Sequence, residues 1–322
     1  MTSKPVLVTG GGGFIGSNLV RALLAEGRSV RVLDDFSTGA AENLDGLAGG
    51  LEIIEGSLLD HDAVARAVEG ASVVFHLAAR GSVARSVEDP IGSHHANATG
   101  TLAVLDASRL AGVDRFVYSS SSSVYGGIDA LPLHEGLPTV PASPYGVTKL
   151  AGEHYCRAFH RTYGFPTVSL RYFNVFGPRQ SPDSAYAAVI PRFISALLSG
   201  ERPVVQGDGG QSRDFTYVDN VVHANLCAAG APDEALGRAF NVAQGGRYSL
   251  MDLLEALRPI VGSGEVEIEW APPRPGDIRH SQADVTAARE LLGYAPEVTF
   301  EEGLRRTVAW LAERAGAVRT AA

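Results

Sequence analysis

The residues of this chain best suited to acid–base chemistry are a tyrosine and a lysine in the segment SPYGVTK, residues 143–149. Ser143 suits the N-cap of a helix and Pro144 its first turn, so Tyr145 and Lys149 would share one face of that helix. A phenol with a pKa of about 10 is a poor base near pH 7, but a neighbouring ammonium stabilises the phenolate and lowers that pKa. The pair could therefore remove a proton from a substrate hydroxyl. Two surface side chains on a helix are the alternative interpretation.

A run of five serines, residues 119–123, follows an apolar stretch and precedes Val-Tyr-Gly. Ligands of parallel sheets bind at the carboxyl ends of the strands, so hydroxyls placed directly after a strand point to where chemistry can occur. A flexible serine linker is the alternative. The position of the run after a strand-like segment favours a place in the active site.

The segment TGGGGFIG, residues 9–16, contains a glycine pattern typical of dinucleotide binding. It can be read as GxxGxxG, with Gly10, Gly13 and Gly16, or as GxGxxG, with Gly11 in place of Gly10. Either pattern lets the backbone approach a pyrophosphate that rests on a helix N-terminus, whereas a structural turn would only collect glycine. Asp34 ends the next strand-like run at the distance expected for a residue that binds the adenine-ribose hydroxyls. Because its charge would repel a 2′-phosphate, we predict NAD as the cofactor.

The elements that must hold these residues alternate regularly in the first half of the chain. Strands are expected at residues 5–9, 30–33, 51–55, 72–77, 115–119 and 166–171, with helices at 14–25, 62–68 and 102–111. The strand-like runs are almost continuously apolar, as in strands buried on both faces. The pattern predicts an α/β fold with a doubly wound parallel sheet of the Rossmann type.

The pattern becomes irregular after about residue 173. Helices are expected at 187–199, 251–260 and 300–315, and strands at 203–205, 239–242 and 266–269. Thr299 and Glu302 suggest a capping box for the last helix. We therefore expect an NAD-binding domain over residues 1–173 and a smaller, irregular α/β substrate lobe over residues 174–322, with the segment near 215–245 packing back on the first domain.

Composition limits the class of protein. The 322 residues are 45% hydrophobic and 20% charged, with a net charge of −9 and no run of lysine or arginine. Nucleic acid and an anionic membrane surface are therefore not expected partners. The two cysteines, Cys156 and Cys227, form no disulfide pattern, and no signal or membrane segment is apparent, so a cytoplasmic protein is expected. The nine histidines, including the adjacent His94 and His95, show no zinc-binding spacing, and no metal is expected.

Taken together, the segments TGGGGFIG, VFHLAA, SSSSSVYG, SPYGVTK and RYFNVFGPRQ resemble the extended short-chain dehydrogenase/reductase family, and within it the nucleotide-sugar 4-epimerases. The similarity extends from Pro5 to about Trp310. It implies that Ser121 assists Tyr145 and that Lys149 binds the nicotinamide ribose. The NAD contacts that it implies are Gly10, Gly13, Phe14, Ile15, Gly16, Asp34, Leu77, Ala78, Ala79, Ser119, Tyr145, Lys149 and Tyr172. It also implies a homodimer, for which helices 102–111 and 147–162 are the candidate interface.

The residues after Ser121 indicate the reaction. In the related sugar 4,6-dehydratases an Asp-Glu pair that eliminates water follows the catalytic hydroxyl, whereas this chain has Ser122 and Ser123. Epimerisation needs only one base and a reversible hydride acceptor. The resemblance therefore implies a 4-epimerase of a UDP-sugar that acts through a transient 4-keto sugar.

The resemblance also implies where the nucleotide sugar binds. Arg213 and Arg274 match positions that hold the diphosphate, a task that suits the planar guanidinium fork, and Asp277 matches one that binds the ribose. A family position four residues beyond this aspartate limits the size of the C2 substituent, and here it is Ser281. A serine leaves room for an N-acetyl group, so we predict UDP-GlcNAc and UDP-GalNAc, with UDP-glucose and UDP-galactose as further substrates. The remaining implied contacts are Ser82, Ser121, Ser122, Asn174, Val189, Val204 and Gln206.

Several features leave alternatives open. Gly56-Ser57 stands where many relatives have Gly-Asp for the adenine edge. Either Arg80 or Arg192, if it pointed inward, could pair with a sugar carboxylate, as in a UDP-glucuronate 4-epimerase or another NDP-sugar epimerase or decarboxylase. A non-catalytic NAD-sensing protein on the same fold is a more remote alternative. The residues by themselves specify neither the sugar, the base, the direction of flux nor the oligomeric state.

Overall fold

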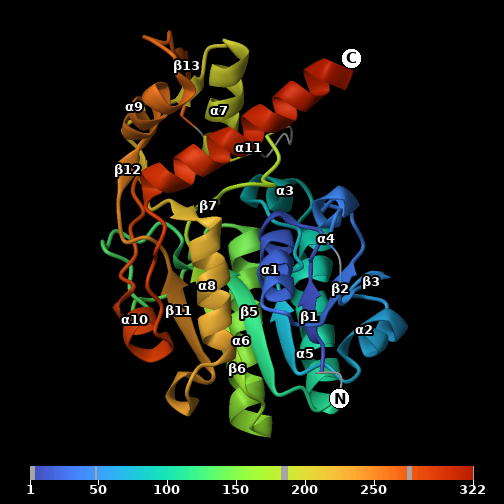
Figure 1. The fold of residues 1–322 in the computed structure, drawn as a ribbon. Helices are drawn as coiled ribbons and strands as arrows, with labels where there is room; N and C mark the ends of the chain where they lie inside the picture. Colours follow the sequence, from blue (N-terminus) through green and yellow to red (C-terminus); the bar gives the residue numbers. More distant parts are fainter. Residues whose placement is uncertain (1–3, 48, 183–187, 274–277, 322) are drawn as a thin grey trace.

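The computed structural model describes residues 4–47, 49–182, 188–273 and 278–321 (Figure 1). Its centre is a seven-stranded sheet in the order β11-β6-β5-β4-β1-β2-β3. All neighbouring strands pair in parallel. The strands are β1 (Val6–Thr9), β2 (Val30–Asp34), β3 (Leu51–Glu55), β4 (Val73–His76), β5 (Arg115–Ser121), β6 (Thr167–Tyr172) and β11 (Arg238–Val242). This confirms the predicted Rossmann-type sheet.

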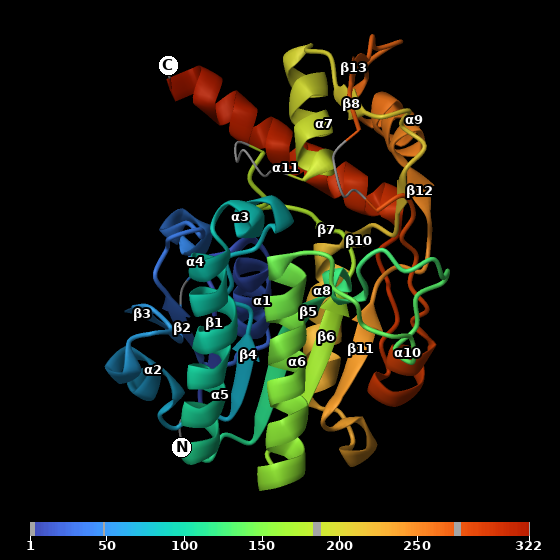
Figure 2. The same cartoon turned by 180° about the vertical axis from the view of Figure 1, so that it is seen from behind.

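Helices cover both faces of the sheet. On one face lie α1 (Phe14–Ala25), α8 (Val218–Ala229) and α10 (Thr286–Leu292), which share one apolar core (Figure 1). On the other lie α2 (His61–Val68), α5 (Gly100–Leu110) and α6 (Pro144–Tyr163) (Figure 2). Strand β5 shows why both faces are apolar, because Val117 joins the first core and Phe116 and Tyr118 join the second.

A short series of turns and helices connects β4 to α5. It comprises α3 (Val83–Glu88), α4 (Pro90–His94) and a single π-helical turn (His95–Thr99). In the described part of the chain, 3-10 turns also occur at Ala41–Leu44, Ser122–Tyr125 and Asp233–Ala235. A π turn is rare and occurs frequently at functional sites, and this one lies close to the carboxyl end of β4 in the chain.

The second lobe stands over the end of the sheet where the strands terminate (Figures 1 and 2). Its helices are α7 (Val189–Ser199), α9 (Leu250–Val261) and α11 (Phe300–Ala321). Short strands pair as β7 (Val175–Phe176) with β10 (Thr216–Tyr217), β9 (Ser212–Arg213) with β12 (Tyr248–Ser249), and β8 (Val204–Gln206) with β13 (Glu269–Ala271). Its own core contains stacked rings, among them Phe215 on Phe300.

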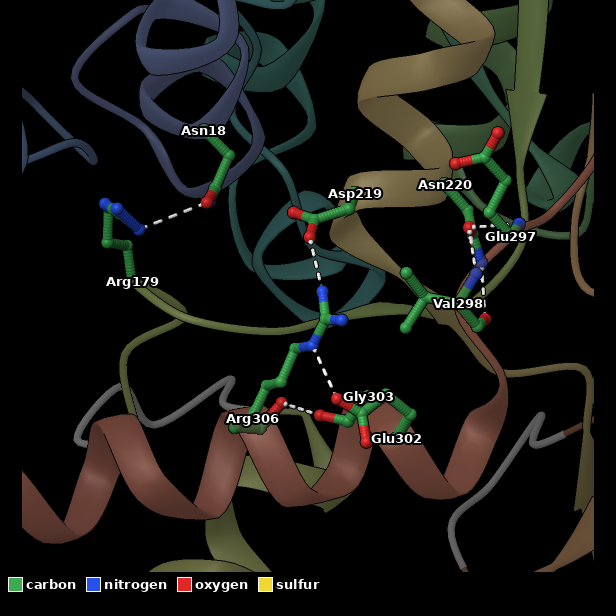
Figure 3. Close-up of polar contacts among 10 residues, drawn as sticks. Asn18, Arg179, Asp219, Asn220, Glu297, Val298, Glu302, Gly303 and Arg306 are labelled. Atoms are coloured by element: carbon green, nitrogen blue, oxygen red, sulfur yellow. Dashed lines mark hydrogen bonds and ion pairs between the residues drawn. The ribbon is translucent and has the colours of Figure 1, made fainter. Parts of the chain in front are cut away.

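Polar contacts join the lobe to the sheet domain (Figure 3). Arg306 of α11 pairs with Asp219 at the start of α8, with 3.3 Å between nitrogen and oxygen. Arg179, in the loop after β7, donates to the Asn18 side-chain oxygen of α1 at 3.1 Å. The Asn220 side-chain oxygen accepts the backbone N–H groups of residues 297 and 298. The first of these contacts holds α11 against α8, the second holds the loop after β7 against α1, and the third holds the segment before α11 against α8.

The predicted elements differ from the structure in a few places. Helix 14–25 and strand 51–55 match α1 and β3, whereas the strand expected at 266–269 begins only at Glu269, where its pairing with Val204 of β8 starts. Helices α8 and α10 were not predicted. In the expected capping box the Thr299 hydroxyl accepts the Glu302 N–H, but the Glu302 carboxylate pairs with arginines of the next turn. No helix in the described ranges is long and apolar enough to cross a membrane.

Candidate active site

The glycine-rich loop between β1 and α1 forms a cradle that larger residues could not form. Gly10 has a φ of +71°, and a Cβ there would lie 2.6 Å from the Ala78 backbone nitrogen. A Cβ on Gly16 would lie 2.0 Å from the Gly10 carbonyl oxygen. Gly13 is the N-cap of α1 and supplies no side-chain cap. The helix therefore presents open backbone N–H groups and its positive end, which fits a pyrophosphate.

Asp34 closes this loop from the end of β2. One carboxylate oxygen accepts the Gly12 N–H at 2.8 Å and the other accepts the Phe36 N–H at 2.9 Å. Burial raises the pKa of Asp34, while these backbone hydrogen bonds act to lower it. Each oxygen keeps a lone pair for a further donor, so the carboxylate is placed to accept the hydroxyls of a ribose.

A cavity of about 330 Å³ opens beside the loop. It is formed at the carboxyl ends of β1, β2, β3 and β4, the place where nucleotides bind in such sheets. Of the predicted cofactor contacts, those that line it are Gly10, Gly13, Asp34, Leu77, Ala78 and Ala79. Ser57 also lines it, but its hydroxyl accepts the Leu59 N–H. The cavity fits the adenosine half of a dinucleotide.

The other predicted cofactor contacts lie outside this cavity. Phe14 and Ile15 pack against the lobe core, and Gly16 lies in the tight turn. Tyr172 is the last residue of β6, and its hydroxyl donates to the side-chain oxygen of Asn225 on α8 at 3.0 Å. The carbonyl of Ser119 faces α6 rather than the glycine loop.

Helix α6 carries the predicted base. The Ser143 hydroxyl accepts the Gly146 N–H at 3.1 Å, which confirms the expected cap and starts the helix at Pro144. The Ser121 side chain, at the end of β5, lies near enough to the Tyr145 hydroxyl to act on its pKa, and the Lys149 ammonium donates to the Ser119 carbonyl at 2.7 Å. The structure thus brings the three predicted catalytic side chains together at one sheet end.

Burial controls the protonation of this group. It raises the pKa of Tyr145, and the nearby Ser121 side chain acts to lower it. Burial also lowers the pKa of Lys149 to about 8. The Lys149 ammonium donates to the Ser119 carbonyl, and its Nζ atom lies 6.0 Å from the Tyr145 ring centre, so it can act on the phenol through its charge and not through a hydrogen bond. Forming the phenolate therefore needs stabilisation beyond these side chains.

Sequence reasoning missed a buried polar chain under the site. His76, at the end of β4, hydrogen-bonds Thr9 at 2.8 Å and Thr101 at 2.9 Å. Burial and the nearby Lys149 lower its pKa to about 3, so the imidazole is neutral. Asn97, in the π turn, donates to the Thr148 hydroxyl at 3.1 Å and accepts the Arg80 N–H at 2.7 Å. The π turn thus directs an amide at α6, the helix that carries the predicted base, and no sequence pattern indicated this contact.

A second missed contact comes from α3. The buried Ser86 hydroxyl accepts the Tyr145 N–H at 3.0 Å and donates to the Val83 carbonyl at 2.7 Å. The predicted substrate contact Ser82 is the N-cap of the same short helix, with a φ of +150°. The backbone of the predicted base is therefore tied to the segment that carries Ser82.

The predicted substrate residues of the lobe gather around residues 212–214. The Arg213 guanidinium donates to the Ser212 carbonyl at 2.9 Å, and the Ser281 N–H donates to the same carbonyl at 3.0 Å. Asn174 donates to the Asp214 carbonyl at 3.1 Å. Ser281 is only 7% exposed. Arg274 and Asp277 lie outside the described residues.

Three other substrate predictions lie at separate places. Val204 and Gln206 belong to β8, and the Gln206 carbonyl accepts the Gln211 side-chain N–H at 2.7 Å. Val189 begins α7. Ser122 opens the 3-10 turn that follows Ser121.

Asp214 is a further residue that the sequence did not single out. Its buried carboxylate accepts the N–H groups of Gln244, Gly245 and Ala283 at 3.1–3.2 Å. Burial raises the pKa of Asp214 to about 7, and these hydrogen bonds act to lower it. It holds the segment of Ser281 beside β9.

The two arginines considered for a sugar carboxylate occupy different places. Arg80 pairs with Asp89 at 2.5 Å and lines the dinucleotide cavity. Arg192 is half-buried on α7. The Arg80 ion pair engages its guanidinium beside the expected cofactor, away from the lobe residues around Arg213.

Comparison with known proteins agrees with this geometry. Residues 6–243 match the model of the NAD dependent epimerase/dehydratase family. A UDP-glucose 4-epimerase of Mycolicibacterium smegmatis is 43% identical over 306 residues, which cover 94% of this chain and 96% of that protein.

Two solved structures are similar over almost the whole chain. A UDP-N-acetylglucosamine 4-epimerase from Methanobrevibacter ruminantium, in complex with UDP-N-acetylmuramic acid, has a TM-score of 0.92 and 41% identity, covering 98% of this chain and 100% of that one. A UDP-glucose 4-epimerase from Thermus thermophilus, in complex with NAD, has a TM-score of 0.85 and 36% identity, covering 95% and 98% of the two chains.

Proposed function

The chain belongs to the NAD dependent epimerase/dehydratase family, and on that premise we propose that it is a 4-epimerase of UDP-sugars. It is an enzyme, and its cofactor is NAD. The observation that carries the reaction type is the end of β5, where Ser121 meets Tyr145 and is followed by Ser122 and Ser123. One base without a second acid–base pair suits epimerisation and does not suit loss of water.

The structure fits NAD at the glycine loop. Gly10, Gly13 and Gly16 leave room for the pyrophosphate at the start of α1, and Asp34 would accept the adenine-ribose hydroxyls. Lys149 would bond the nicotinamide ribose. When bound, NAD supplies a reversible hydride acceptor, so that the sugar C4 passes through a keto state and can be reduced again from its other face.

The side chains of this protein would handle the proton. The Tyr145 oxygen takes the proton from the sugar O4 and later returns it, and the Ser121 hydroxyl shares that hydrogen bond. Because burial raises the pKa of Tyr145, the phenolate must form next to positive charge. Lys149, with a pKa of about 8, is mostly protonated at pH 7 and supplies part of that charge.

The sugar would bind between the sheet end and the lobe. We propose that residues 1–173 mainly hold NAD and residues 174–322 mainly hold the UDP-sugar, with α8 and β11 packed on the first domain. Arg213 would bind the diphosphate. The Ser281 N–H and the Arg213 guanidinium both donate to the Ser212 carbonyl, so these two residues lie close together. Because the Ser281 side chain is small, this arrangement supports acceptance of the N-acetyl group of UDP-GlcNAc and UDP-GalNAc, with UDP-glucose and UDP-galactose as further substrates.

We propose that two copies associate through α5 and α6. Exposed apolar and aromatic side chains lie on these helices, at Leu110, Val147, Tyr155 and Tyr163. The two helices lie side by side on one outer face (Figure 2). Burying such side chains between two subunits would remove them from water.

We also propose a cytoplasmic location, which is supported by the two cysteines that form no disulfide.

The proposed function is tested by using NMR to monitor the conversion of each substrate separately. Purified protein is mixed separately with UDP-GlcNAc, UDP-glucose and UDP-glucuronate, and the C4 epimer is observed. We expect UDP-GlcNAc to be epimerised, with UDP-glucose also converted. Tyr145→Phe should lower turnover by about 10²–10⁴-fold because the proton acceptor is lost. Turnover of UDP-glucuronate alone would contradict the sugar assignment, and full activity of Tyr145→Phe would contradict the mechanism.

A further inference from the structure

Three residues spaced four apart on α6 contact three consecutive serines of β5. The Tyr145 hydroxyl lies near the Ser121 side chain, Lys149 donates to the Ser119 carbonyl, and Glu153 accepts the Ser120 hydroxyl. The first two contacts belong to the proposed chemistry. The third, between Ser120 and Glu153, lies one turn further from the substrate and has no place in it.

The helix is pressed closely onto the strand at this point. A Cβ on Gly152 would lie 2.2 Å from the Tyr118 hydroxyl oxygen, and this hydroxyl donates to the Lys149 carbonyl at 3.3 Å. A slide or rotation of α6 along β5 would therefore move the Tyr145 hydroxyl relative to Ser121. The Ser120–Glu153 contact opposes such a slide because its two groups face each other in only one register.

Glu153 is itself held by a buried arginine. Arg171 of β6 donates to both carboxylate oxygens, at 2.9 and 2.7 Å, and both side chains are 7% exposed. A buried ion pair contributes little net stability, since desolvation offsets the attraction, but it is highly directional. Its geometry therefore serves to fix the position of the carboxylate.

The same arginine continues toward the substrate lobe. Its third nitrogen donates to the Tyr125 hydroxyl at 2.8 Å, which donates to the Asn241 side-chain oxygen at 2.8 Å. The Asn241 amide donates to the carbonyls of Leu133 and Asp284 at 2.9 and 3.0 Å. Asp284 lies three residues after Ser281, in the segment that Asp214 also holds.

We propose that Ser120, Glu153, Arg171, Tyr125 and Asn241 form a positioning network with two arms. The Ser120 arm fixes the register of α6, and so the place of the Tyr145 hydroxyl. The Tyr125 arm fixes the segment of residues 281–284, and so the wall of the sugar pocket. The inference rests on the proposed function, which assigns Tyr145 as the base and residues 281–284 to the sugar pocket.

Two single-hydroxyl variants separate the arms and keep the buried ion pair. We expect Ser120→Ala to lower kcat about tenfold and to leave KM within about twofold, since a displaced base loses alignment rather than binding. We expect Tyr125→Phe to raise KM for UDP-GlcNAc about fivefold and to leave kcat within about twofold.

Thr167→Val is the matched control. The Thr167 hydroxyl is buried on β6 and donates to the Cys156 carbonyl of α6 at 2.8 Å, outside the network. It should lower the free energy of unfolding as the other variants do, and change neither kcat nor KM. A purely structural role would make all three variants behave alike, and that result would overturn the proposal.

A readout without turnover distinguishes failure of the network from failure of the proposed function. In protein labelled with ¹³C at the tyrosine ζ carbon, Tyr145→Phe assigns the Tyr145 signal. Ser120→Ala should shift that signal and its titration, whereas Thr167→Val should not. A wild-type protein that epimerises no UDP-sugar would contradict the proposed function, and an unmoved Tyr145 signal in Ser120→Ala would contradict the network.

Discussion

The glycine loop and the substrate lobe hold their expected ligands by different means. The loop is shaped by backbone, since Gly10 and Gly16 leave no space for a side chain and Gly13 leaves the start of α1 uncapped. The lobe is assembled by side chains that reach across the chain, as Asp214 does when it binds the backbone near residues 244 and 283. A site made of backbone tolerates no added atoms, whereas one made of side chains can change its specificity by single substitutions.

The largest effect should come from filling the glycine loop. In Gly16→Ala the new Cβ would meet the Gly10 carbonyl at 2.0 Å, so the backbone must shift. We expect the purified protein to lose its bound NAD and to lose roughly 1–3 kcal/mol of stability. Absorbance of released cofactor and urea unfolding measure the two effects.

Gly264→Ala in the lobe is the control for this variant. A Cβ there has nothing within 4 Å, so NAD content and unfolding should be unchanged. If Gly16→Ala behaved like Gly264→Ala, the loop would not be the tight cradle described above.

The next largest effect should come from Ser281, in the wall of the proposed sugar pocket. Ser281 is only 7% exposed, so in Ser281→Tyr the larger ring would occupy the space proposed for the N-acetyl group. We therefore expect kcat/KM for UDP-GlcNAc to fall about 10- to 100-fold relative to that for UDP-glucose. Ser281→Ala keeps the space and should preserve the ratio. An unchanged ratio in the tyrosine variant would place the N-acetyl group elsewhere.

The buried lysine should give a pH signature of intermediate size. Burial lowers the pKa of Lys149 from 10.5 to about 8, so between these values the unfolded chain binds more protons than the folded one. The free energy of unfolding should therefore rise with pH in this window, by at most about 1.4 kcal/mol per unit. Urea unfolding from about pH 8 to about pH 10 measures this slope, and Lys149→Met should remove it. Equal slopes in the wild-type protein and in Lys149→Met would show that Lys149 keeps its ordinary pKa.

The smallest effect should come from Arg306, whose ion pair with Asp219 joins α11 to α8. Arg306 pairs with Asp219 and Glu302, and its own side chain is 47% exposed (Figure 3). Exposed pairs contribute little, so Arg306→Ala should lower Tm by about 2 °C or less and leave NAD content unchanged. A larger loss would mean that the two parts of the molecule depend on this contact.

Local signals in the sequence were enough for the elements around NAD. Strand β1, the glycines and α1 follow each other without interruption, and Asp34 lies at the end of the next strand, so their spacing predicts their meeting. The Ser143 cap, Tyr145 and Lys149 likewise fall within one stretch of α6. Helix α8 was missed because its Asn and His residues break the apolar pattern, although its inner face is buried.

Residues that depend on distant partners could not be found in this way. Ser120 was one serine among five, and only the pairing of β5 with β6 and the docking of α6 show that it meets Glu153 and Arg171. Asn97 and Ser86 became relevant only when the π turn and α3 were seen against α6.

The sequence by itself indicated the parallel sheet, the NAD loop and Tyr145 as the candidate base, because these depend on residue type and on contacts between near neighbours along the chain. The tertiary structure decided how the base is held, which ionisation state burial favours for Tyr145 and Lys149, and which distant segments surround Ser281. The physical reason is that burial and hydrogen bonds between residues as far as 161 positions apart arise only when the strands and helices pack.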